Sequence, residues 1–185
     1  MGEKKRKMKA RPTAPLKLDL GCGPNKKEGF LGVDCREFKG VDVVADLRQP
    51  WPWADNSVDE IYCSHFIEHL TADARIHFAN ELYRVLKPGA PAQIIVPHWN
   101  SHRAYGDLTH QWPPVSEMWF FYLNKEWRAA NAPHNDGYTC DFDATWGYSL
   151  RQDLLTRNEE YRQYAISNYK DAAQDIIATL KAKKT

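Results

Sequence analysis

The sequence is poor in cysteine and has no long apolar run. Its 185 residues hold four scattered cysteines, none in a Cys-x-x-Cys pair: Cys22, Cys35, Cys63 and Cys140. This spacing predicts neither a disulfide framework nor a zinc site, and we expect a reducing, cytoplasmic compartment. No apolar stretch reaches the roughly 20 residues of a membrane span, and no apolar segment follows the basic N-terminus. Neither a transmembrane helix nor a secretory signal is expected.

The chain also lacks a large net charge, because basic ends offset an acidic body. Nine of the 25 Lys and Arg residues lie in residues 1–11 and 181–185, which together hold one acid. The remaining body has 16 basic and 23 acidic residues. A body of that sign repels phosphate backbones, so it disfavours nucleic acid as a partner. We interpret residues 1–14 as a basic, disordered tail.

The rest of the composition is that of an ordinary globular protein, with 43% hydrophobic and 26% charged residues, and predicts a single domain over residues 15–185. Short apolar runs predict strands at 16–20, 31–34, 41–45, 57–64 and 93–97. Thr71 is predicted to cap a helix that ends at Lys87-Pro88-Gly89. Short apolar strands that alternate with loops or helices predict a doubly wound, Rossmann-like α/β fold. Its sheet is expected to be mostly parallel, with helices on both faces.

The composition changes after the fifth predicted strand. Residues 97–150 hold 12 of the 23 aromatic residues and four of the seven histidines. We interpret them as an aromatic-rich insertion packed onto the sheet. Residues 141–150 alternate loosely, as a strand would, and residues 169–182 fit a helix and a strand equally well.

The first strand is followed directly by Asp19-Leu20-Gly21-Cys22-Gly23. Glycine at positions 21 and 23 allows a ligand to approach the backbone at the carboxyl end of this strand, where open α/β sheets bind nucleotides. Position 26 is Lys, not the third glycine of the dinucleotide pattern. Asp34 follows Gly21 after 13 residues instead of about 20, so the first crossover is too short for a full helix. A carboxylate at Asp34 can accept from both hydroxyls of a ribose.

The sequence resembles the small class I S-adenosylmethionine-dependent methyltransferases of the type 11 group. The resemblance covers residues 16–97, a little under half of the chain, and its segments keep the order and spacing of that family. These segments are 18–23, 32–34, 45–47, 56–62, 64–70 and 81–89. Two positions depart from the family pattern: Asn25 replaces a third glycine, and Ala90 replaces a frequent second one.

The resemblance implies methyl transfer as the activity and S-adenosylmethionine as the cofactor. It implies that Asp19 and the backbone of residues 21–23 hold the methionine end, and that Asp34 binds the ribose. Asp46 would bind the adenine amino group, with Leu47 against the ring, while residues 64–65 line the pocket near the sulfonium. The implied cofactor-binding residues are Asp19, Gly21, Cys22, Gly23, Asn25, Asp34, Asp46, Leu47, Ser64 and His65.

Methyl transfer from a sulfonium is an in-line displacement that depends mostly on positioning. A general base helps where the acceptor starts protonated, and histidine titrates near neutral pH. We predict His98 or His110 as this base, and structural roles for Glu68 and His69. Residues 97–150 are the predicted acceptor site, with Trp99, His102, Tyr105, Asp107 and Trp112 as its residues. The alternative is that the aromatic side chains only cover the sheet. The set His98, His102, Asp107 and His110 is not spaced like a known metal motif, so no metal is expected.

The acceptor class is partly constrained. Cys63-Ser64-His65-Phe66 is not the Asn/Asp-Pro-Pro-aromatic signature of amino-methylating DNA and protein methyltransferases, and no Pro-Cys dipeptide suggests cytosine C5 chemistry. We expect a small molecule, such as a sugar or a lipid head group, or else a peptide side chain. Two other functions stay open, a non-catalytic S-adenosylmethionine-binding module and a nicotinamide-dependent oxidoreductase. Lys26 and the short crossover argue against the second. The sequence does not indicate the oligomeric state.

Overall fold

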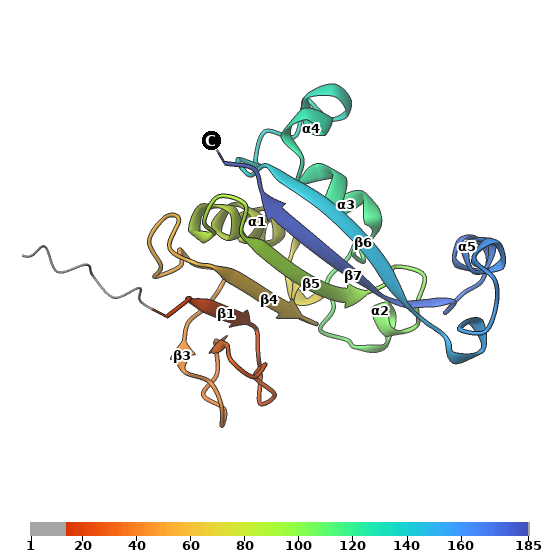
Figure 1. The fold of residues 1–185 in the computed structure, drawn as a ribbon, viewed down its shortest axis with the longest axis horizontal. Coiled ribbons are helices and arrows are strands. Elements are labelled where there is room, and N and C mark those ends of the chain that lie inside the picture. Colours follow the sequence, from red (N-terminus) through yellow and green to blue (C-terminus); the bar gives the residue numbers. More distant parts are fainter. Residues whose placement is uncertain (1–13, 185) are drawn as a thin grey trace, which may run out of the picture.

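The computed structural model describes residues 14–184, so nearly all of the predicted basic tail lies outside the described residues. Its seven strands form one sheet (Figure 1). The strands are β1 (Lys17–Leu20), β2 (Leu31–Asp34), β3 (Val43–Val44), β4 (Glu60–Ser64), β5 (Pro91–Pro97), β6 (Phe142–Leu150) and β7 (Ala173–Ala182). The helices are η1 (Ile67–His69), α1 (Ala72–Val85), α2 (Arg103–Gly106), α3 (Glu117–Tyr122), α4 (Lys125–Asn131), η2 (Gln152–Leu154) and α5 (Glu159–Asn168), where η marks a 3₁₀ helix.

The strand order is β3-β2-β1-β4-β5-β7-β6. The first five strands are parallel, whereas β7 runs antiparallel between β5 and β6. This sheet confirms the predicted Rossmann-like α/β class. The ambiguous segment 169–182 contains the strand β7, because its alternating pattern pairs with two neighbours. The order reverses between β1 and β4, and a ligand crevice lies outside the carboxyl ends of strands at such a switch point.

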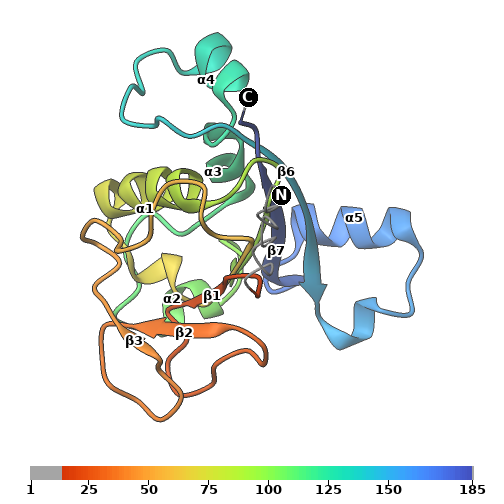
Figure 2. The same ribbon diagram turned by 60° about the vertical axis from the view of Figure 1, so that its left-hand side comes forward.

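The two faces of the sheet are covered unequally. Leu18, Ile61, Ala92 and Leu180 pair across four strands on one face, and all four are fully buried. On the opposite face, Tyr62, Gln93 and Thr179, which pair across β4, β5 and β7, are only half-buried. Figure 2 shows α1 and α3 on one side of β7 and α5 on the other. Helices therefore lie on both sides, as predicted, but α5 packs into a small cluster of its own and the main core is one-sided.

The segments that connect β1, β2 and β3 contain no helix. Residues 24–30 form only turns and bends, which confirms that the first crossover is too short for a multi-turn helix. The longer helix α1 begins where the sequence predicts it, because the Thr71 hydroxyl accepts a hydrogen bond from the amide of Ala74 at 3.4 Å. It ends at Val85, before a turn in which Gly89 has a φ of +72°. No helix within residues 14–184 is long and apolar enough to cross a bilayer.

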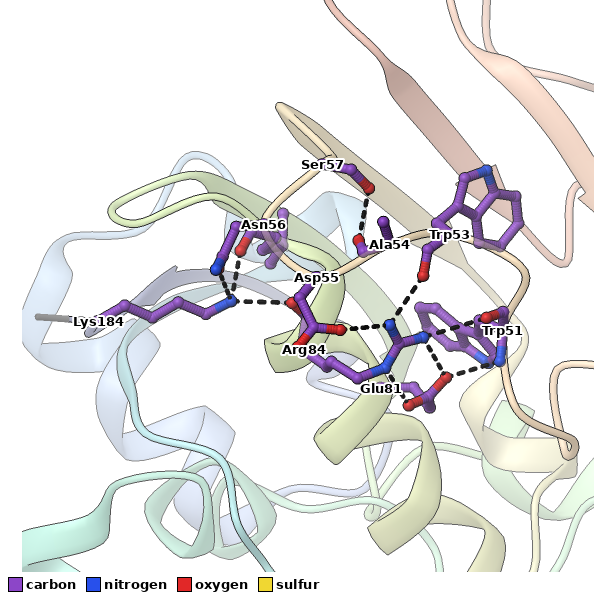
Figure 3. A network of polar contacts seen from close by, with 10 residues as sticks. Trp51, Trp53, Ala54, Asp55, Asn56, Ser57, Glu81, Arg84 and Lys184 are labelled. Carbon is purple, nitrogen blue, oxygen red and sulfur yellow. Dashed lines mark hydrogen bonds and ion pairs between the residues drawn. The ribbon is translucent and has the colours of Figure 1, made fainter.

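A polar network closes the amino-terminal end of the sheet (Figure 3). The guanidinium of Arg84 donates to both carboxylate oxygens of Glu81, at 2.7 and 2.8 Å, and to the carbonyls of Trp51 and Trp53. Glu81 also accepts from the amide of Trp51 at 2.6 Å. Lys184 donates to the carbonyl of Arg84 at 3.0 Å. These hydrogen bonds connect the loop before β4 and the C-terminal segment to the end of α1.

Candidate active site

The loop after β1 is shaped by two glycines in the left-handed region. Gly21 has a φ of +70°, and a Cβ at this position would lie 2.4 to 2.7 Å from the side chain of Phe66. No larger residue fits there. Gly23 has a φ of +51°, and its missing Cβ faces open space, with no atom within 4 Å. The loop therefore presents bare backbone to a ligand, as cofactor binding requires.

Two carboxylates hold this loop in place. Oδ2 of Asp19 accepts from the amide of Lys27 at 2.7 Å, and burial raises the pKa of Asp19 above its usual value even though this bond and the lysine charge lower it. Asp34, at the end of β2, accepts from the amide of Gly23 at 3.0 Å and from the amide of Arg36 at 3.1 Å. Each oxygen of Asp34 has a second lone pair, so both remain able to accept from a ribose hydroxyl.

The predicted adenine-binding residues follow β3. The guanidinium of Arg48 donates to both oxygens of Asp46, at 2.9 Å each, and this pairing lowers the pKa of the carboxyl. An adenine amino group would share Asp46 with Arg48. Leu47 is 3% exposed and packs in the core, so little of its side chain is free to contact a ring. The structure therefore favours Asp46 over Leu47 as an adenine contact.

The two remaining loop residues predicted to bind the cofactor have no special backbone or reactive role. Asn25 is exposed and lies outside the left-handed region, so the loop does not require the glycine that relatives carry there. Cys22 is half-buried, and burial together with the charges of Asp19 and Asp34 raises the pKa of its thiol to about 11. The thiol is therefore protonated at neutral pH and is not a nucleophile.

The end of β4 turns sharply at His65, which has a φ of +54°. A non-glycine residue in this region is strained, and such strain gathers at functional sites. Nδ1 of His65 lies 3.3 Å from Oε1 of Glu68, and this hydrogen bond raises the pKa of the imidazole. Ser64 is half-buried directly before it. The chain thus places the His65 ring at the carboxyl edge of the sheet, where the resemblance places the sulfonium.

An open cavity of about 400 Å³ lies at this edge, and we call it the histidine cavity. It is lined by His65, Glu68, His69, Pro97, His102, Arg103, Gly106, Asp107 and His110. Its wall comes from the segment after β4, the end of β5 and helix α2 with the loop that follows. The structure therefore brings the predicted acceptor residues His102 and Asp107 and the predicted base His110 together with His65, a predicted cofactor residue.

The two predicted bases, His98 and His110, differ in burial and in the hydrogen bonds of their rings. His98 is 2% exposed: its Nδ1 accepts from the amide of Asn100 at 3.1 Å, and its Nε2 lies 3.0 Å from Glu117. With both nitrogens engaged inside the protein, His98 is held in a structural position, which argues against its predicted role as general base. His110 is half-buried, and its Nδ1 lies 3.2 Å from the carbonyl of Ala104. Its Nε2 has no partner within the described chain.

The predicted aromatic acceptor residues line a different hollow. Trp99, Tyr105 and Trp112 are 42%, 51% and 78% exposed and border a hollow of about 560 Å³ beside Glu117, Met118 and Phe121. Helix α2 separates the two hollows, because it turns Tyr105 toward this one and Arg103 toward the histidine cavity. Further along the insertion, Phe120 and Phe142 are buried in the core instead. The predicted acceptor region is thus partly surface and partly packing.

Two acids that pair with residues of the cavity wall come from positions that sequence analysis did not single out. Asp175 on β7 is buried and pairs with Arg103 at 2.7 Å, and its Oδ1 lies 4.0 Å from Nε2 of His65. Asp171 accepts from Nδ1 of His102 at 2.8 Å. No local pattern marks these acids. Glu68 does carry a local signal, because it lies four residues beyond the end of β4, but the sequence suggested a structural role for it.

Comparison with known proteins agrees with this architecture. The family model described as a methyltransferase domain matches residues 25–92, which include Asp34, Asp46 and His65 but begin after the glycine loop. A solved S-adenosylmethionine-dependent methyltransferase from Archaeoglobus fulgidus is 22% identical, with a TM-score of 0.66 over 90% of this chain and 86% of that one. Another, from Methanosarcina mazei, is 13% identical, with a TM-score of 0.54 over 91% and 92% of the two chains. No curated protein matches the sequence.

The sheet order, the glycine loop and the carboxylates that follow β2 and β3 define a class I methyltransferase fold. Together with the match of residues 25–92 to a methyltransferase-domain model, this fold indicates an S-adenosylmethionine-dependent methyltransferase, with S-adenosylmethionine as the cofactor. These findings confirm the class of enzyme that the sequence predicted. Neither the nicotinamide-dependent oxidoreductase nor the non-catalytic module gains support from them.

Proposed function

We propose that the enzyme transfers a methyl group to a small polar acceptor bound in the histidine cavity. The observation that carries this proposal is the position of the cavity at the carboxyl ends of β4 and β5, directly beyond His65. Ligands of open α/β sheets bind at this edge. A volume of about 400 Å³ lies in the range of small-molecule pockets and is too small for a folded macromolecule.

The cavity wall favours an acceptor with hydroxyl or amino groups. Its side chains are mostly histidines and carboxylates, and its one arginine, Arg103, is already paired with Asp175. A negatively charged acceptor would meet Glu68 and Asp107 without a free arginine to offset them. Hydroxyl and amino groups donate hydrogen bonds that these carboxylates and ring nitrogens accept. A sugar or an amino-bearing head group has this chemistry.

In the proposed reaction, different residues bind the cofactor and the acceptor. When bound, S-adenosylmethionine would supply an electrophilic methyl group on a sulfonium with a neutral thioether as the leaving group, and the acceptor would lose its proton to solvent. Asp19, Asp34 and the glycine loop hold the cofactor on one side of this edge. The cavity holds the acceptor on the other side and excludes alternative orientations, and such positioning supplies much of the rate.

The proposal predicts a specific dependence on His110. The purified enzyme is incubated with S-adenosylmethionine and a panel of sugars, amino alcohols, head groups, peptides and RNA, and formation of S-adenosylhomocysteine is measured. Because His110 lines the cavity that positions the acceptor, His110→Ala should lower turnover of the active acceptor by about 100-fold or more, with unchanged cofactor affinity by calorimetry. His134→Ala, which changes an exposed histidine outside the cavity, is the matched control. Turnover of only RNA or peptides, or full activity of His110→Ala, would contradict the proposal.

The charge distribution and the cysteines bear on the binding partners and the cellular location that we propose. The acidic body supports a small molecule over nucleic acid as the acceptor. The four cysteines are all free thiols, and Cys63 and Cys140 are buried. Free thiols in these positions support our proposal of a reducing, cytoplasmic location.

A further inference from the structure

Three side chains on the wall of the histidine cavity converge on one point. A carboxylate oxygen of Glu68 and a ring nitrogen from each of His69 and His110 lie within 4.8 Å of one another. The rings of His69 and His110 meet edge to face, with centroids 4.7 Å apart. Glu68 and His69 end the short helix η1, whereas His110 follows α2, so two separate segments build the cluster.

The hydrogen bond of His110 fixes the tautomer of its ring. Nδ1 lies 3.2 Å from the carbonyl oxygen of Ala104. A carbonyl oxygen only accepts, so Nδ1 carries the proton and donates it. Nε2 of the neutral ring is then an unprotonated nitrogen with a free lone pair.

The tautomer of His69 is fixed in a similar way, by Thr109 and Asp107. The hydroxyl of Thr109 donates its only proton to Asp107 at 2.7 Å. It must therefore accept from Nδ1 of His69, which lies 2.9 Å away. In the neutral ring of His69, Nε2 is then also the nitrogen with a free lone pair. Histidines that bind metals have this arrangement, in which the distal nitrogen donates to a carbonyl or to a group held by a carboxylate.

Glu68 provides an independent indication of a missing ligand. Glu68 is 4% exposed, and one of its carboxylate oxygens, Oε1, lies 3.3 Å from Nδ1 of His65. The other oxygen, Oε2, is buried and accepts no hydrogen bond from any described residue. A buried carboxylate oxygen without a partner is costly, because its desolvation is not offset. A cation bound beside it would remove this cost.

We propose that Glu68, His69 and His110 bind a divalent transition-metal ion, with Zn²⁺ as the best match. Two imidazoles and one carboxylate are a ligand set of catalytic zinc sites, which leave a further position open for water or substrate. Because Glu68, His69 and His110 all line the histidine cavity, an open position would be accessible to a molecule bound there. Sequence spacing did not indicate this site, because His110 lies 41 residues beyond His69 and belongs to no metal motif.

The role of the ion rests on the proposed function. An acceptor hydroxyl in the cavity would take the open position, and the ion would orient its oxygen and favour loss of its proton. Ion binding itself depends only on the three side chains. It can therefore be measured without acceptor or cofactor, so a failure of the metal site and a failure of the methyl-transfer proposal are separate results.

The test uses full-length protein without a histidine tag. Cys35 is replaced by Ser throughout, because an exposed thiol also binds zinc. The protein is treated with a chelator, dialysed and titrated with Zn²⁺ in a calorimeter, and Co²⁺ is added separately to record its visible absorption. The variants are Glu68→Gln, His110→Ala and Thr109→Val, with His134→Ala as the control for an exposed histidine outside the cluster.

We expect one Zn²⁺ per chain in the parent protein and in His134→Ala. His110→Ala and Glu68→Gln should weaken binding by more than about 100-fold, and Thr109→Val by about 10- to 100-fold, because it removes only the support of His69. Thr109 is exposed, so this variant keeps the test informative if Glu68→Gln does not fold. Absence of saturable Zn²⁺ binding by the parent protein, or parent-like affinity in both His110→Ala and Thr109→Val, would overturn the proposal.

Discussion

The amide of Gly23 donates a hydrogen bond to a carboxylate oxygen of Asp34 across 3.0 Å. This bond joins the loop after β1 to the end of β2, so the residue implied to bind the ribose also sets the loop implied to bind the methionine end. A change at Asp34 is therefore expected to disturb both parts of the cofactor site at once.

Replacing Asp34 by Ala should weaken binding of S-adenosylmethionine by about 2–4 kcal/mol, which is roughly 30- to 1,000-fold. The estimate corresponds to two hydrogen bonds between ribose hydroxyls and a charged group. Calorimetry measures the affinity directly. Glu37→Ala removes an equal charge from an exposed position three residues away and should bind normally. Equal affinity of both variants would remove Asp34 from the cofactor site.

Gly21→Ala should destabilise the protein more than Gly23→Ala. Both positions have positive φ, which costs an L-residue roughly 1–2 kcal/mol. A Cβ at Gly21 would also lie 2.4 Å from Phe66, and forcing a group into packed space adds about 1–3 kcal/mol. A Cβ at Gly23 meets no such obstacle. Urea unfolding of the two variants tests the difference, and a larger loss at Gly23 would contradict the packing argument.

The pairing of Glu81 with Arg84 should make stability depend on pH. The hydrogen bonds from Arg84 lower the pKa of Glu81 in the folded protein, so this contribution is present above about pH 4.5 and is lost as the pH falls through the folded pKa. Glu81→Gln should cost about 2 kcal/mol at pH 7, and the difference from the parent protein should shrink in acid.

Urea unfolding at pH 7 and near pH 4 measures this change. Glu60→Gln breaks an exposed ion pair with Lys17 and should cost no more than about 1 kcal/mol at pH 7. A cost for Glu81→Gln that stays constant with pH would show that the carboxylate charge is not what Arg84 recognises.

The four cysteines should differ in their reaction with iodoacetamide. Cys35 is exposed and should be alkylated first at pH 8. The pKa of Cys22 is raised to about 11, so its thiolate is scarce and its reaction should be on the order of 100-fold slower than that of an ordinary thiol. Mass spectrometry of timed samples gives the rates, and labelling in urea should make all four similar. Labelling of Cys22 as fast as Cys35 in the folded protein would refute this.

The sequence predicted best what depends on short stretches of chain. The strands, the cap at Thr71 and the loop at Gly21 each follow from a few neighbouring residues, because alternation, capping and turn formation are local effects. The segment 169–182 stayed ambiguous because its apolar residues satisfy both periods. Only pairing with β5 and β6 decides between them.

The chemistry of the histidines was less predictable, because their partners are far away in the sequence. Glu117 occupies a nitrogen of His98 from 19 residues away, and Asp171 binds His102 from 69 residues away. The difference between His98 and His110 is therefore a matter of packing. Composition placed both in one aromatic-rich segment and gave no means to separate a buried ring from one that faces a cavity.

The helix-free connections among β1, β2 and β3 link cofactor binding to local folding. The edge strand β3 has only two residues, and no helix from these connections covers this part of the sheet. Local unfolding of such a region costs less free energy than unfolding of the core around α1. A ligand that binds only the folded form of this region shifts the local unfolding equilibrium toward that form by mass action. Amide hydrogen exchange in residues 21–47 should therefore slow markedly when S-adenosylmethionine binds, while exchange in β5 and β7 stays nearly unchanged. Binding of the methyl donor would then stabilise the folded form of residues 21–47 against local unfolding.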